Sequence, residues 1–313
     1  MDKKIAFIFP GQGAQYVGMG KDFFDSFSIA KQLFEEANDL LHFNLSEIIF
    51  NGPEDSLKKT VNNQVAIFVT AAALLQVLKD ELPHIIPNVC AGLSLGEYTA
   101  LYASNKISFK DALLLIQKRA QFMNDASEKT CGTMAAVIGL DANIIEETIK
   151  KINPPNLVWV ANYNTVNQTV ISGTIEGVEA ATAALQEIGA KRVMPLKVSG
   201  AFHSGLMIDA QEKMKIQIEA TNFESSDIDI IMNVPGDYVR SVENIKKYLI
   251  LQITNSIRWV QSIAMMEKNK VEIYLEIGPS KTLSMMNRKN NVSGISINLD
   301  KISDLEKISH EIR

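Results

Sequence analysis

The chain has few cysteines and few histidines. Its 313 residues include two cysteines, Cys90 and Cys131, and four histidines. Two cysteines with no metal-like or framework spacing indicate neither a disulfide scaffold nor a zinc site. We therefore expect no bound metal and a cytoplasmic protein.

Basic charge is also scarce. Lys and Arg number 31 against 36 Asp and Glu, which gives a formal net charge of -5. Recognition of nucleic acid needs a concentrated basic face. We therefore expect no nucleic-acid partner.

The chain lacks an apolar run long enough to cross a membrane. The longest run, Val65–Leu78, is shorter than the roughly 20 residues of a span and contains Thr70 and Gln76. The segment "IAFIF" (5–9) is too short for a signal-peptide core and runs directly into a Pro-Gly pair. We predict a core helix over the first segment, a buried strand over the second, and no membrane partner.

What the chain does have is an alternation of short β-rich runs with longer helical stretches. This pattern predicts an α/β domain with a parallel sheet, and 46% hydrophobic residues suffice for a large core. Outside the middle of the chain, the expected strands are 4–9, 88–94 and 272–277, and the expected helices are 39–50, 61–82, 96–104 and 108–127, the last capped by Ser108. The segment "EIYLEIGPSKTLSMM" (272–286) is expected to continue from its strand through a turn into a further helix.

The middle of the chain has a different rhythm. Strand, helix, strand, strand, helix and strand are expected at 133–138, 141–152, 157–164, 168–173, 174–189 and 191–199. That β-α-β-β-α-β order is typical of a ferredoxin-like unit. We predict a small ferredoxin-like subdomain of residues 130–198 inserted into a large α/β subdomain made of residues 1–129 and 199–313.

The segment "GLSLG" (92–96) fits the G-x-S-x-G pattern of a nucleophile elbow. In an elbow the serine occupies a tight strand-to-helix turn, and the following helix directs backbone N–H groups, led by that of Leu95, at a developing oxyanion. The alternative is an ordinary turn, because short matches arise by chance. The strand before the segment and the helix after it favour Ser94 as a nucleophile.

A serine nucleophile needs a base. His42 lies in an expected helix, His84 follows a proline in a loop, and His310 is near the charged C-terminus. His203, in "VSGAFHSGLM", stands where the chain returns from the small subdomain, and a cleft between subdomains is a usual place for a site. An ordinary loop histidine is the alternative, but elimination makes His203 the best candidate base.

Two further segments have open interpretations. "FPGQGAQ" (9–15) lacks the G-K-[ST] of a phosphate loop, and Tyr16 stands where a dinucleotide fingerprint needs its third glycine. Such a turn could instead place the backbone N–H of Gln12 beside the nucleophile. Arg119 lies within an apolar helix, where it either extends to the surface or points inward to bind a carboxylate through two hydrogen bonds.

These segments together resemble one family, the malonyl-CoA:acyl carrier protein transacylases of bacterial type II fatty acid synthesis. The resemblance covers nearly the whole chain and rests on seven segments in order: "FPGQGAQ", "GLSLGEY", "KRAQFM", "ANYN…QTVISG", "GAFHSGLM", "LQITNSIRW" and "EIGPSKTL". It implies an α/β-hydrolase-like domain with a ferredoxin-like insert, in agreement with the subdomains expected above.

The resemblance also implies a ping-pong reaction without a cofactor. Ser94 would take the malonyl group from malonyl-CoA with His203 as base, and pass it to the phosphopantetheine thiol of holo-acyl carrier protein. Several binding roles follow from the matched positions: oxyanion donation by the N–H groups of Gln12 and Leu95, carboxylate binding by Arg119, orientation of the histidine by the carbonyl of Gln252, and lining of the cleft by Asn162 and Asn164. We further expect a monomer.

Two positions bear on how this chain would work. Leu93 stands where the family usually has a histidine beside the nucleophile, which changes the local polarity but leaves the base in place. Phe202 resembles the phenylalanine of malonyl-selective domains, which leaves no room for an α-methyl group. Two other functions share the main motifs: a discrete acyltransferase serving a polyketide synthase, and a serine thioester hydrolase.

Overall fold

A computed structural model describes residues 3–152 and 154–312, and within these ranges the main strands form two sheets. The larger sheet has the order β10-β9-β1-β2-β7-β8. Its strands are β1 (Ile5–Phe9), β2 (Val89–Gly92), β7 (Asp229–Met232), β8 (Asp237–Tyr238), β9 (Ile273–Ile277) and β10 (Ile295–Leu299). Neighbouring strands are parallel except β7 and β8, so the expected parallel sheet carries an antiparallel edge strand.

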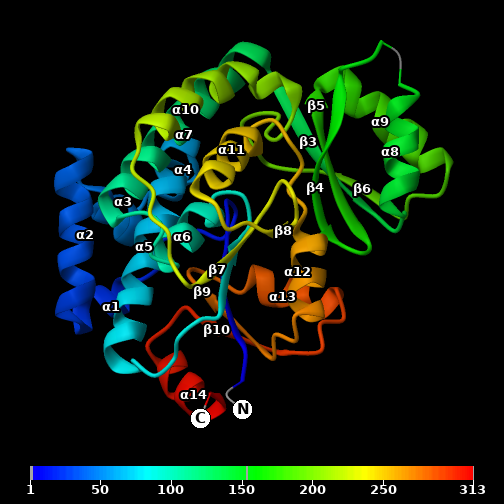
Figure 1. The fold of residues 1–313 in the computed structure, drawn as a ribbon. Coiled ribbons are helices and arrows are strands. Elements are labelled where there is room, and N and C mark those ends of the chain that lie inside the picture. The colour runs from blue at the N-terminus through cyan, green and yellow to red at the C-terminus, as the bar shows by residue number, and fades with distance from the viewer. Residues whose placement is uncertain (1–2, 153, 313) are drawn as a thin grey trace.

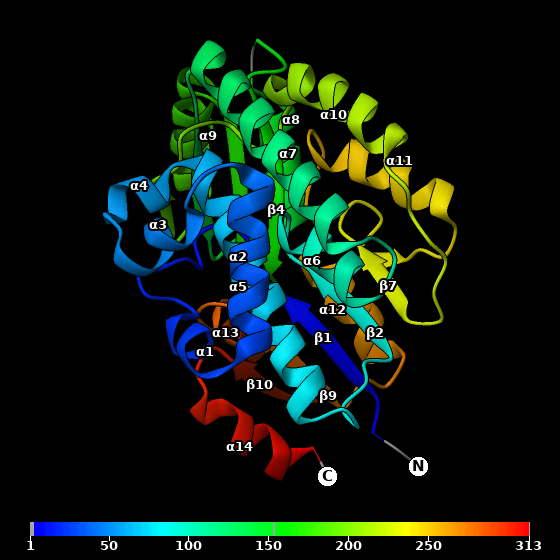
Figure 2. The same cartoon turned by 90° about the vertical axis from the view of Figure 1, so that its left-hand side faces the viewer.

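Helices cover both faces of this sheet. They are α1 (Lys21–Ser26), α2 (Ser28–Leu41), α3 (Leu45–Asn51), α4 (Glu54–Lys58), α5 (Thr60–Glu81), α6 (Gly96–Ala103), α7 (Phe109–Thr130), the short 3₁₀ helix η1 (Gly205–Met207), α10 (Ile208–Ala220), α11 (Val242–Gln252), α12 (Trp259–Lys268), α13 (Thr282–Lys289) and α14 (Ser303–Glu311). Figure 2 looks onto the face covered by α2, α5 and α7.

Alternation along β1 explains the two-sided core. Phe7 and Phe9 pack into the cluster formed with α2, α5 and α7, whereas Ala6 and Ile8 belong to the opposite cluster with Trp259 of α12. Successive strand residues point to opposite faces, so a strand buried on both sides must be apolar throughout. The unbroken apolar run "IAFIF" therefore forms the predicted buried strand.

Helix α5 is the central helix of the larger core. Within the part of the chain that the structure describes, α5 is the one helix that is both long enough and apolar enough to cross a membrane. However, 83% of its most apolar 18-residue stretch is buried inside the protein. Apolar residues all round a helix require burial on all sides. The prediction of a core helix at this position is confirmed.

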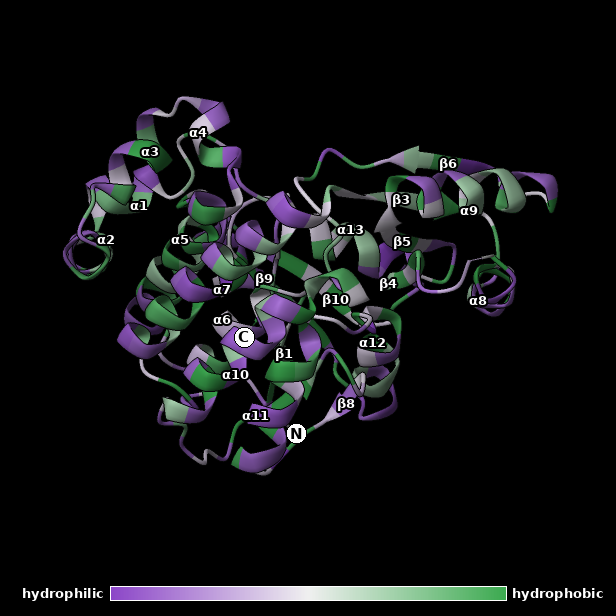
Figure 3. Ribbon diagram, turned by 90° about the horizontal axis from the view of Figure 1, so that it is seen from above, coloured by the Kyte–Doolittle hydropathy of each residue, from purple (hydrophilic) through white to green (hydrophobic). Residues whose placement is uncertain are grey.

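The smaller sheet has the order β4-β5-β3-β6 and is antiparallel. The unit consists of β3 (Gly132–Ile138), α8 (Ala142–Lys150), β4 (Val158–Thr165), β5 (Gln168–Thr174), α9 (Ile175–Glu187) and β6 (Arg192–Pro195). The sheet, α8 and α9 lie together on one side of the molecule (Figures 1 and 3). The predicted fold class and the β-α-β-β-α-β order are confirmed, while the subdomain boundaries remain a prediction.

One expected helix is wrong. Residues 39–50 do not form one helix, because His42 has a left-handed backbone (φ 59°) and ends α2. Asn44 then caps α3, its side chain accepting a hydrogen bond from the backbone N–H of Glu47. Asparagine competes for backbone hydrogen bonds and so favours a new helix start. By contrast, Ser108 caps α7 as predicted.

The sheet brings three loops to one edge. Phe9 of β1 pairs with Gly92 of β2, and β2 pairs with β7, all in parallel. The segments that follow these strands therefore leave the same edge of the sheet side by side. In open α/β sheets ligands bind in the crevice beyond these carboxyl ends.

Candidate active site

Ser94 lies in a strained turn between β2 and α6. Its backbone φ is 54°, in the left-handed region that a residue with a side chain seldom adopts. A Cβ on Gly92 would lie 2.0 Å from the carbonyl carbon and oxygen of Gly96, and one on Gly96 would lie 2.1 Å from the carbonyl oxygen of Phe9. Both glycines of the pentapeptide are therefore required by close backbone approach.

The Ser94 hydroxyl contacts His203. Ser94 Oγ is 2.8 Å from His203 Nε2, and His203 Nδ1 is 2.8 Å from the backbone oxygen of Gln252, the last residue of α11. A carbonyl oxygen only accepts hydrogen bonds, so Nδ1 carries the proton. Nε2 of the neutral ring then accepts the hydrogen bond from the serine hydroxyl, as a general base requires.

The surroundings keep His203 neutral. The residue is 4% exposed. Burial, followed by the positive charge of Arg119, lowers the pKa of His203 to about 3, against the opposing effect of the hydrogen bond to Gln252. The imidazole therefore holds its Nε2 lone pair toward Ser94 at neutral pH.

Arg119 points inward from α7 and is 1% exposed. Its Nη2 donates to Ser94 Oγ (3.0 Å) and to Gln252 Oε1 (2.9 Å), and its Nη1 donates to the side-chain oxygen of Gln64 on α5 (2.5 Å). The alternative of an arginine extended to the surface is wrong. Burial lowers the pKa of the guanidinium from its usual value, while nearby Tyr98 and Glu97 oppose that shift.

A small cavity of about 110 Å³ lies over this cluster. It is lined by Gly11, Gln12, Leu93, Ser94, Arg119, Met123, Met134, Asn162, Val198, Phe202 and His203. Asn164 is not among these residues; it sits at a register shift in β4, between Tyr163 and Thr165. Of the two asparagines singled out from the sequence, Asn162 reaches the cavity.

Two backbone N–H groups near Ser94 are free to donate. Within the described residues, neither Gln12 nor Leu95 uses its backbone N–H in a hydrogen bond. Gln12 follows β1 at the edge of the sheet, and Leu95 precedes the first turn of α6. Unpaired N–H groups at a helix start and an adjacent loop can bind negative charge.

Three polar residues of this cluster were not found from the sequence. Gln64, Glu97 and Asn233 are each completely or almost completely buried and hydrogen-bonded to the groups described above. Asn233 accepts a hydrogen bond from the backbone N–H of Ser94 (2.7 Å). The signal for Asn233 was the run "DIIMN", a buried strand that ends in a polar residue.

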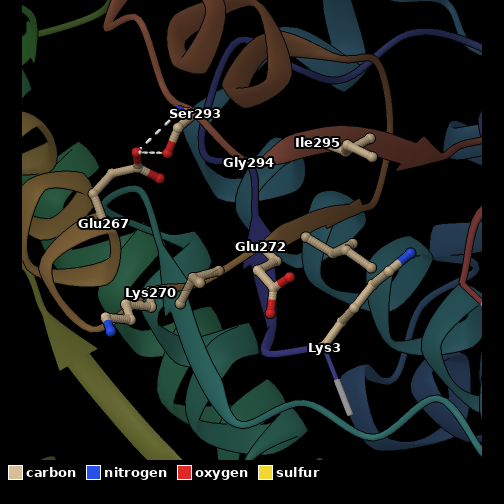
Figure 4. Close-up of a pocket in the computed structure, with 9 residues that line it drawn as sticks. Lys3, Glu267, Lys270, Glu272, Ser293, Gly294 and Ile295 are labelled. Atoms are coloured by element: carbon tan, nitrogen blue, oxygen red, sulfur yellow. Dashed lines mark hydrogen bonds between the residues drawn. The ribbon is translucent and has the colours of Figure 1, made fainter. Parts of the chain in front are cut away.

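A second cavity, of about 400 Å³, lies away from Ser94 beside β9 and β10 (Figure 4). Its lining includes Lys3, Glu267, Lys270, Glu272 and Ser293. Glu267 accepts hydrogen bonds from the backbone N–H and the hydroxyl of Ser293. The described residues that line this cavity include no histidine to act as base beside Ser293 and no arginine to bind a carboxylate, so the smaller cavity is the candidate active site.

Comparison with known proteins agrees with this assignment. Residues 6–297 match the family described as "Acyl transferase domain". The malonyl CoA-acyl carrier protein transacylase of Bacillus subtilis is 43% identical over 289 residues, 92% of this chain and 90% of that protein. The enzyme of the same name from Escherichia coli K12 is 35% identical, over 91% of this chain and 92% of that protein.

Solved structures give the same answer. A malonyl CoA-acyl carrier protein transacylase from Clostridium perfringens superposes with a TM-score of 0.94 and 36% identity, covering 99% of this chain and 97% of that one. A malonyl-transacylase in complex with its type II PKS acyl-carrier protein gives a TM-score of 0.95 and 32% identity, covering 98% and 99%. The chain therefore belongs to the acyl transferase family that includes the malonyl CoA-acyl carrier protein transacylases.

Proposed function

We propose that this protein transfers the malonyl group of malonyl-CoA to the phosphopantetheine thiol of holo-acyl carrier protein, for fatty acid synthesis. The observation that carries the proposal is a buried guanidinium, that of Arg119, 3.0 Å from the hydroxyl of a serine that is also hydrogen-bonded to a neutral histidine. The names of the relatives at 35–43% identity support the same substrates.

In the first half-reaction Ser94 Oγ attacks the thioester carbonyl while His203 Nε2 takes the hydroxyl proton. Negative charge collects on the carbonyl oxygen, where the N–H groups of Gln12 and Leu95 would stabilise it. The carbon–sulfur bond then breaks, His203 returns its proton to the departing sulfur, and coenzyme A leaves as a thiol. Ser94 now carries the malonyl group as an ester.

Arg119 would hold the free carboxylate of the malonyl group. A carboxylate that leaves water without a partner is strongly disfavoured, and a planar guanidinium can meet it with two parallel hydrogen bonds. The contact of Nη2 with Ser94 Oγ weakens once that oxygen is esterified, so an N–H of Nη2 turns to the substrate together with one of Nη1. The guanidinium thus selects an acyl group that ends in a carboxylate.

In the second half-reaction the phosphopantetheine thiol gives its proton to His203 and attacks the ester. His203 then protonates Ser94 Oγ as it leaves, and the malonyl group departs on the carrier. Every group in this sequence comes from the chain or the two substrates, so the proposal requires no further cofactor. Because one chain supplies the whole cluster, we also propose a monomer, and the two unpaired cysteines support a cytoplasmic location.

The cavity lies between the two sheets. Ser94, His203 and Arg119 come from the part that holds the six-stranded sheet, whereas Met134 and Asn162 come from β3 and β4 of the small one. We therefore retain the proposed division into residues 130–198 and the remainder, with the acyl group bound at their junction.

A serine thioester hydrolase is disfavoured because a simple esterase has no need of a buried cation for its acyl group. The solved complex with a type II PKS carrier shows that a close structural neighbour serves a polyketide synthase. The chemistry at Ser94 would be the same with either carrier protein.

The release of coenzyme A tests the proposal. With malonyl-CoA alone, a transacylase should release about one equivalent of coenzyme A per site and then stop, because the ester waits for a thiol. Adding holo-acyl carrier protein should restart release. Continuous release without the carrier would instead establish a hydrolase, and no release at all would contradict the malonyl assignment.

A further inference from the structure

Glu97 is a buried carboxyl that the reaction above does not use. It lies in the first turn of α6, three residues after Ser94, and is completely inaccessible to solvent. Its Oε1 accepts a hydrogen bond from the backbone N–H of Asn233 (2.5 Å), and its Oε2 accepts one from Gln252 Nε2 (2.6 Å). Burying a carboxylate costs free energy unless hydrogen bonds compensate for the lost water. The groups that donate to Glu97 therefore indicate its role.

The first partner, Gln252, has a side-chain amide whose two ends face different groups. Its Nε2 donates to Glu97 Oε2 and to the backbone oxygen of Ser94 (2.8 Å), while its Oε1 accepts from Arg119 Nη2 (2.9 Å). The two ends of an amide have nearly the same shape, so neighbouring donors and acceptors decide which way it faces. The ionised Glu97 carboxylate only accepts, as does the backbone oxygen of Ser94, so the two together require the NH₂ end of the amide to face them.

The orientation of this amide matters for Arg119. If the amide were reversed, its NH₂ group would face the guanidinium, and two donors would meet with no acceptor between them. Arg119 would lose one of the two contacts that hold Nη2 beside Ser94 Oγ. A misplaced guanidinium would weaken binding of the malonyl carboxylate more than attack on the thioester.

The second partner, Asn233, joins Glu97 to the other side of the nucleophile turn. Asn233 Oδ1 accepts the N–H of Ser94 (2.7 Å), and its Nδ2 donates to the backbone oxygen of Gly92 (2.7 Å). Glu97 therefore contacts the two side chains, those of Asn233 and Gln252, that bind the backbone of the strained serine.

We propose that Glu97 is a positioning residue whose carboxyl fixes the orientation of the Gln252 amide and thereby holds Arg119 at Ser94. The proposal rests on the malonyl transfer proposed above, because its effect is read in the choice of acyl group. Burial raises the pKa of Glu97 to about 8, while the hydrogen bonds from Asn233 and Gln252 and the charge of Arg119 oppose that shift. The kinetics should therefore be measured above pH 8, where the ionised carboxylate predominates.

The test is Glu97→Gln, which keeps the shape but adds a donor. One buried donor, from Asn233 or Gln252, then lacks an acceptor. We expect kcat/KM for malonyl-CoA to fall about 5- to 150-fold. This fold-change corresponds to the free energy that one unpaired buried hydrogen-bond donor costs. Acetyl-CoA has no carboxylate, so its kcat/KM should fall by a clearly smaller factor and the malonyl-to-acetyl ratio should drop.

Exchanging the carboxylate and the amide between positions 97 and 252 tests directly whether Glu97 sets the orientation of the Gln252 amide. In the double variant Glu97→Gln/Gln252→Glu, the amide at position 97 can accept from Asn233 and donate to the carboxylate at position 252, which still accepts from Arg119. The backbone oxygen of Ser94 loses its donor at position 252 and keeps the backbone N–H of residue 97, so the recovery should be partial. We expect the double variant to recover part of the malonyl-to-acetyl ratio that Glu97→Gln loses. The matched control is Glu276→Gln, which alters another buried carboxyl that accepts two backbone N–H groups, those of Leu283 and Ser284. This control should leave the ratio unchanged.

The outcomes separate this proposal from the proposed function. If wild-type protein takes up no malonyl group, the proposed function is wrong and this role falls with it. If wild-type protein is loaded but Glu97→Gln lowers both substrates equally, or the double variant recovers nothing, only the role of Glu97 is wrong. If both Glu97 variants fail to fold while Glu276→Gln folds, Glu97 is a structural residue and the proposal is also overturned.

Discussion

At the scale of single residues, the site is a continuous set of hydrogen bonds with one orientation. Arg119 donates to Ser94 Oγ, Ser94 donates to neutral His203, and His203 donates to the backbone oxygen of Gln252. A backbone carbonyl thus holds the imidazole where the familiar catalytic triad has a carboxylate. The serine hydroxyl is aligned for proton transfer before any substrate binds.

Arg119 should set the preference for malonyl-CoA. Arg119→Ala should lower kcat/KM for malonyl-CoA. The loss should correspond to a rise of about 2–5 kcal/mol in the activation free energy, as when one member of a buried charge pair is removed. Acetyl-CoA should be used as well as before or better, and Arg119→Lys should recover only part of the malonyl activity. An equal loss for both substrates in steady-state kinetics would make Arg119 a structural residue.

His203 should act as a base well below the pH at which histidine usually becomes protonated. Its pKa of about 3, lowered from 6.5 mainly by burial, means that Nε2 stays unprotonated as the pH falls through 6.5. The rate of acylation in single turnovers should therefore show no decline at pH 6.5. His203→Ala should slow acylation by about 10²- to 10⁴-fold.

The same shift affects stability. A buried neutral histidine contributes stability above pH 6.5, and that contribution is lost as the pH falls from 6.5 toward 3, where the unfolded chain binds the proton first.

A decline in acylation centred on pH 6.5, or an equal loss of rate in His84→Ala, would contradict the assignment of the base.

Phe202 should exclude branched acyl groups. It is 5% exposed and lines the small cavity next to His203. Phe202→Ser should raise the use of methylmalonyl-CoA relative to malonyl-CoA by about 10- to 200-fold at most, because one methyl group in a pocket is worth about 1–3 kcal/mol. Competition between the two substrates measures this ratio, and an unchanged ratio would remove Phe202 from the specificity pocket.

At the scale of elements, the elbow depends on how closely α6 approaches β1. A helix normally gains stability when glycine is replaced by alanine. Gly96→Ala should do the opposite and lower the free energy of unfolding by about 1–3 kcal/mol, because the new Cβ would meet the carbonyl oxygen of Phe9 at 2.1 Å. Urea unfolding measures the difference, and a rise in stability would show that the approach is looser than described.

Elements with a clear hydrophobic pattern could be predicted from the sequence, including the four-residue strand β2, whereas α10, α11 and the shortest elements were not. Helices α5 and α7 and the alternation in the small sheet follow from hydrophobic periodicity and capping residues. β8 has two residues and α4 has five, which is too short for any period to show. The break at His42 was missed because a left-handed histidine leaves no mark in the apolar pattern.

The residues of the candidate active site also divide into those that the sequence pattern indicates and those that it does not. Ser94, His203 and Arg119 stand in segments with a recognisable pattern, so their chemistry could be inferred before the structure was known. Gln64 and Glu97 could not, because the role of a buried polar residue depends on partners that lie far away in the chain, here 55 and 155 residues away.

At the scale of the whole molecule, parallel neighbours and an inserted sheet create the site. Loops after β1, β2 and β7 meet at one edge of the large sheet, and β3 and β4 of the small sheet close over it. The resulting cavity is small, and Arg119, Phe202 and His203 in its lining are buried. We expect an ester on Ser94 to react slowly with water. Slow hydrolysis is what a transacylase needs while it waits for the carrier.

The intact mass of the protein tests the central claim most directly. After incubation with malonyl-CoA and removal of free substrate, the mass should rise by one malonyl group that maps to Ser94, and Ser94→Ala should show no gain. Holo-acyl carrier protein should then return the mass to its starting value and acquire the malonyl group, whereas buffer alone should not. An adduct that survives Ser94→Ala, or one lost to water as fast as to the carrier, would contradict the account.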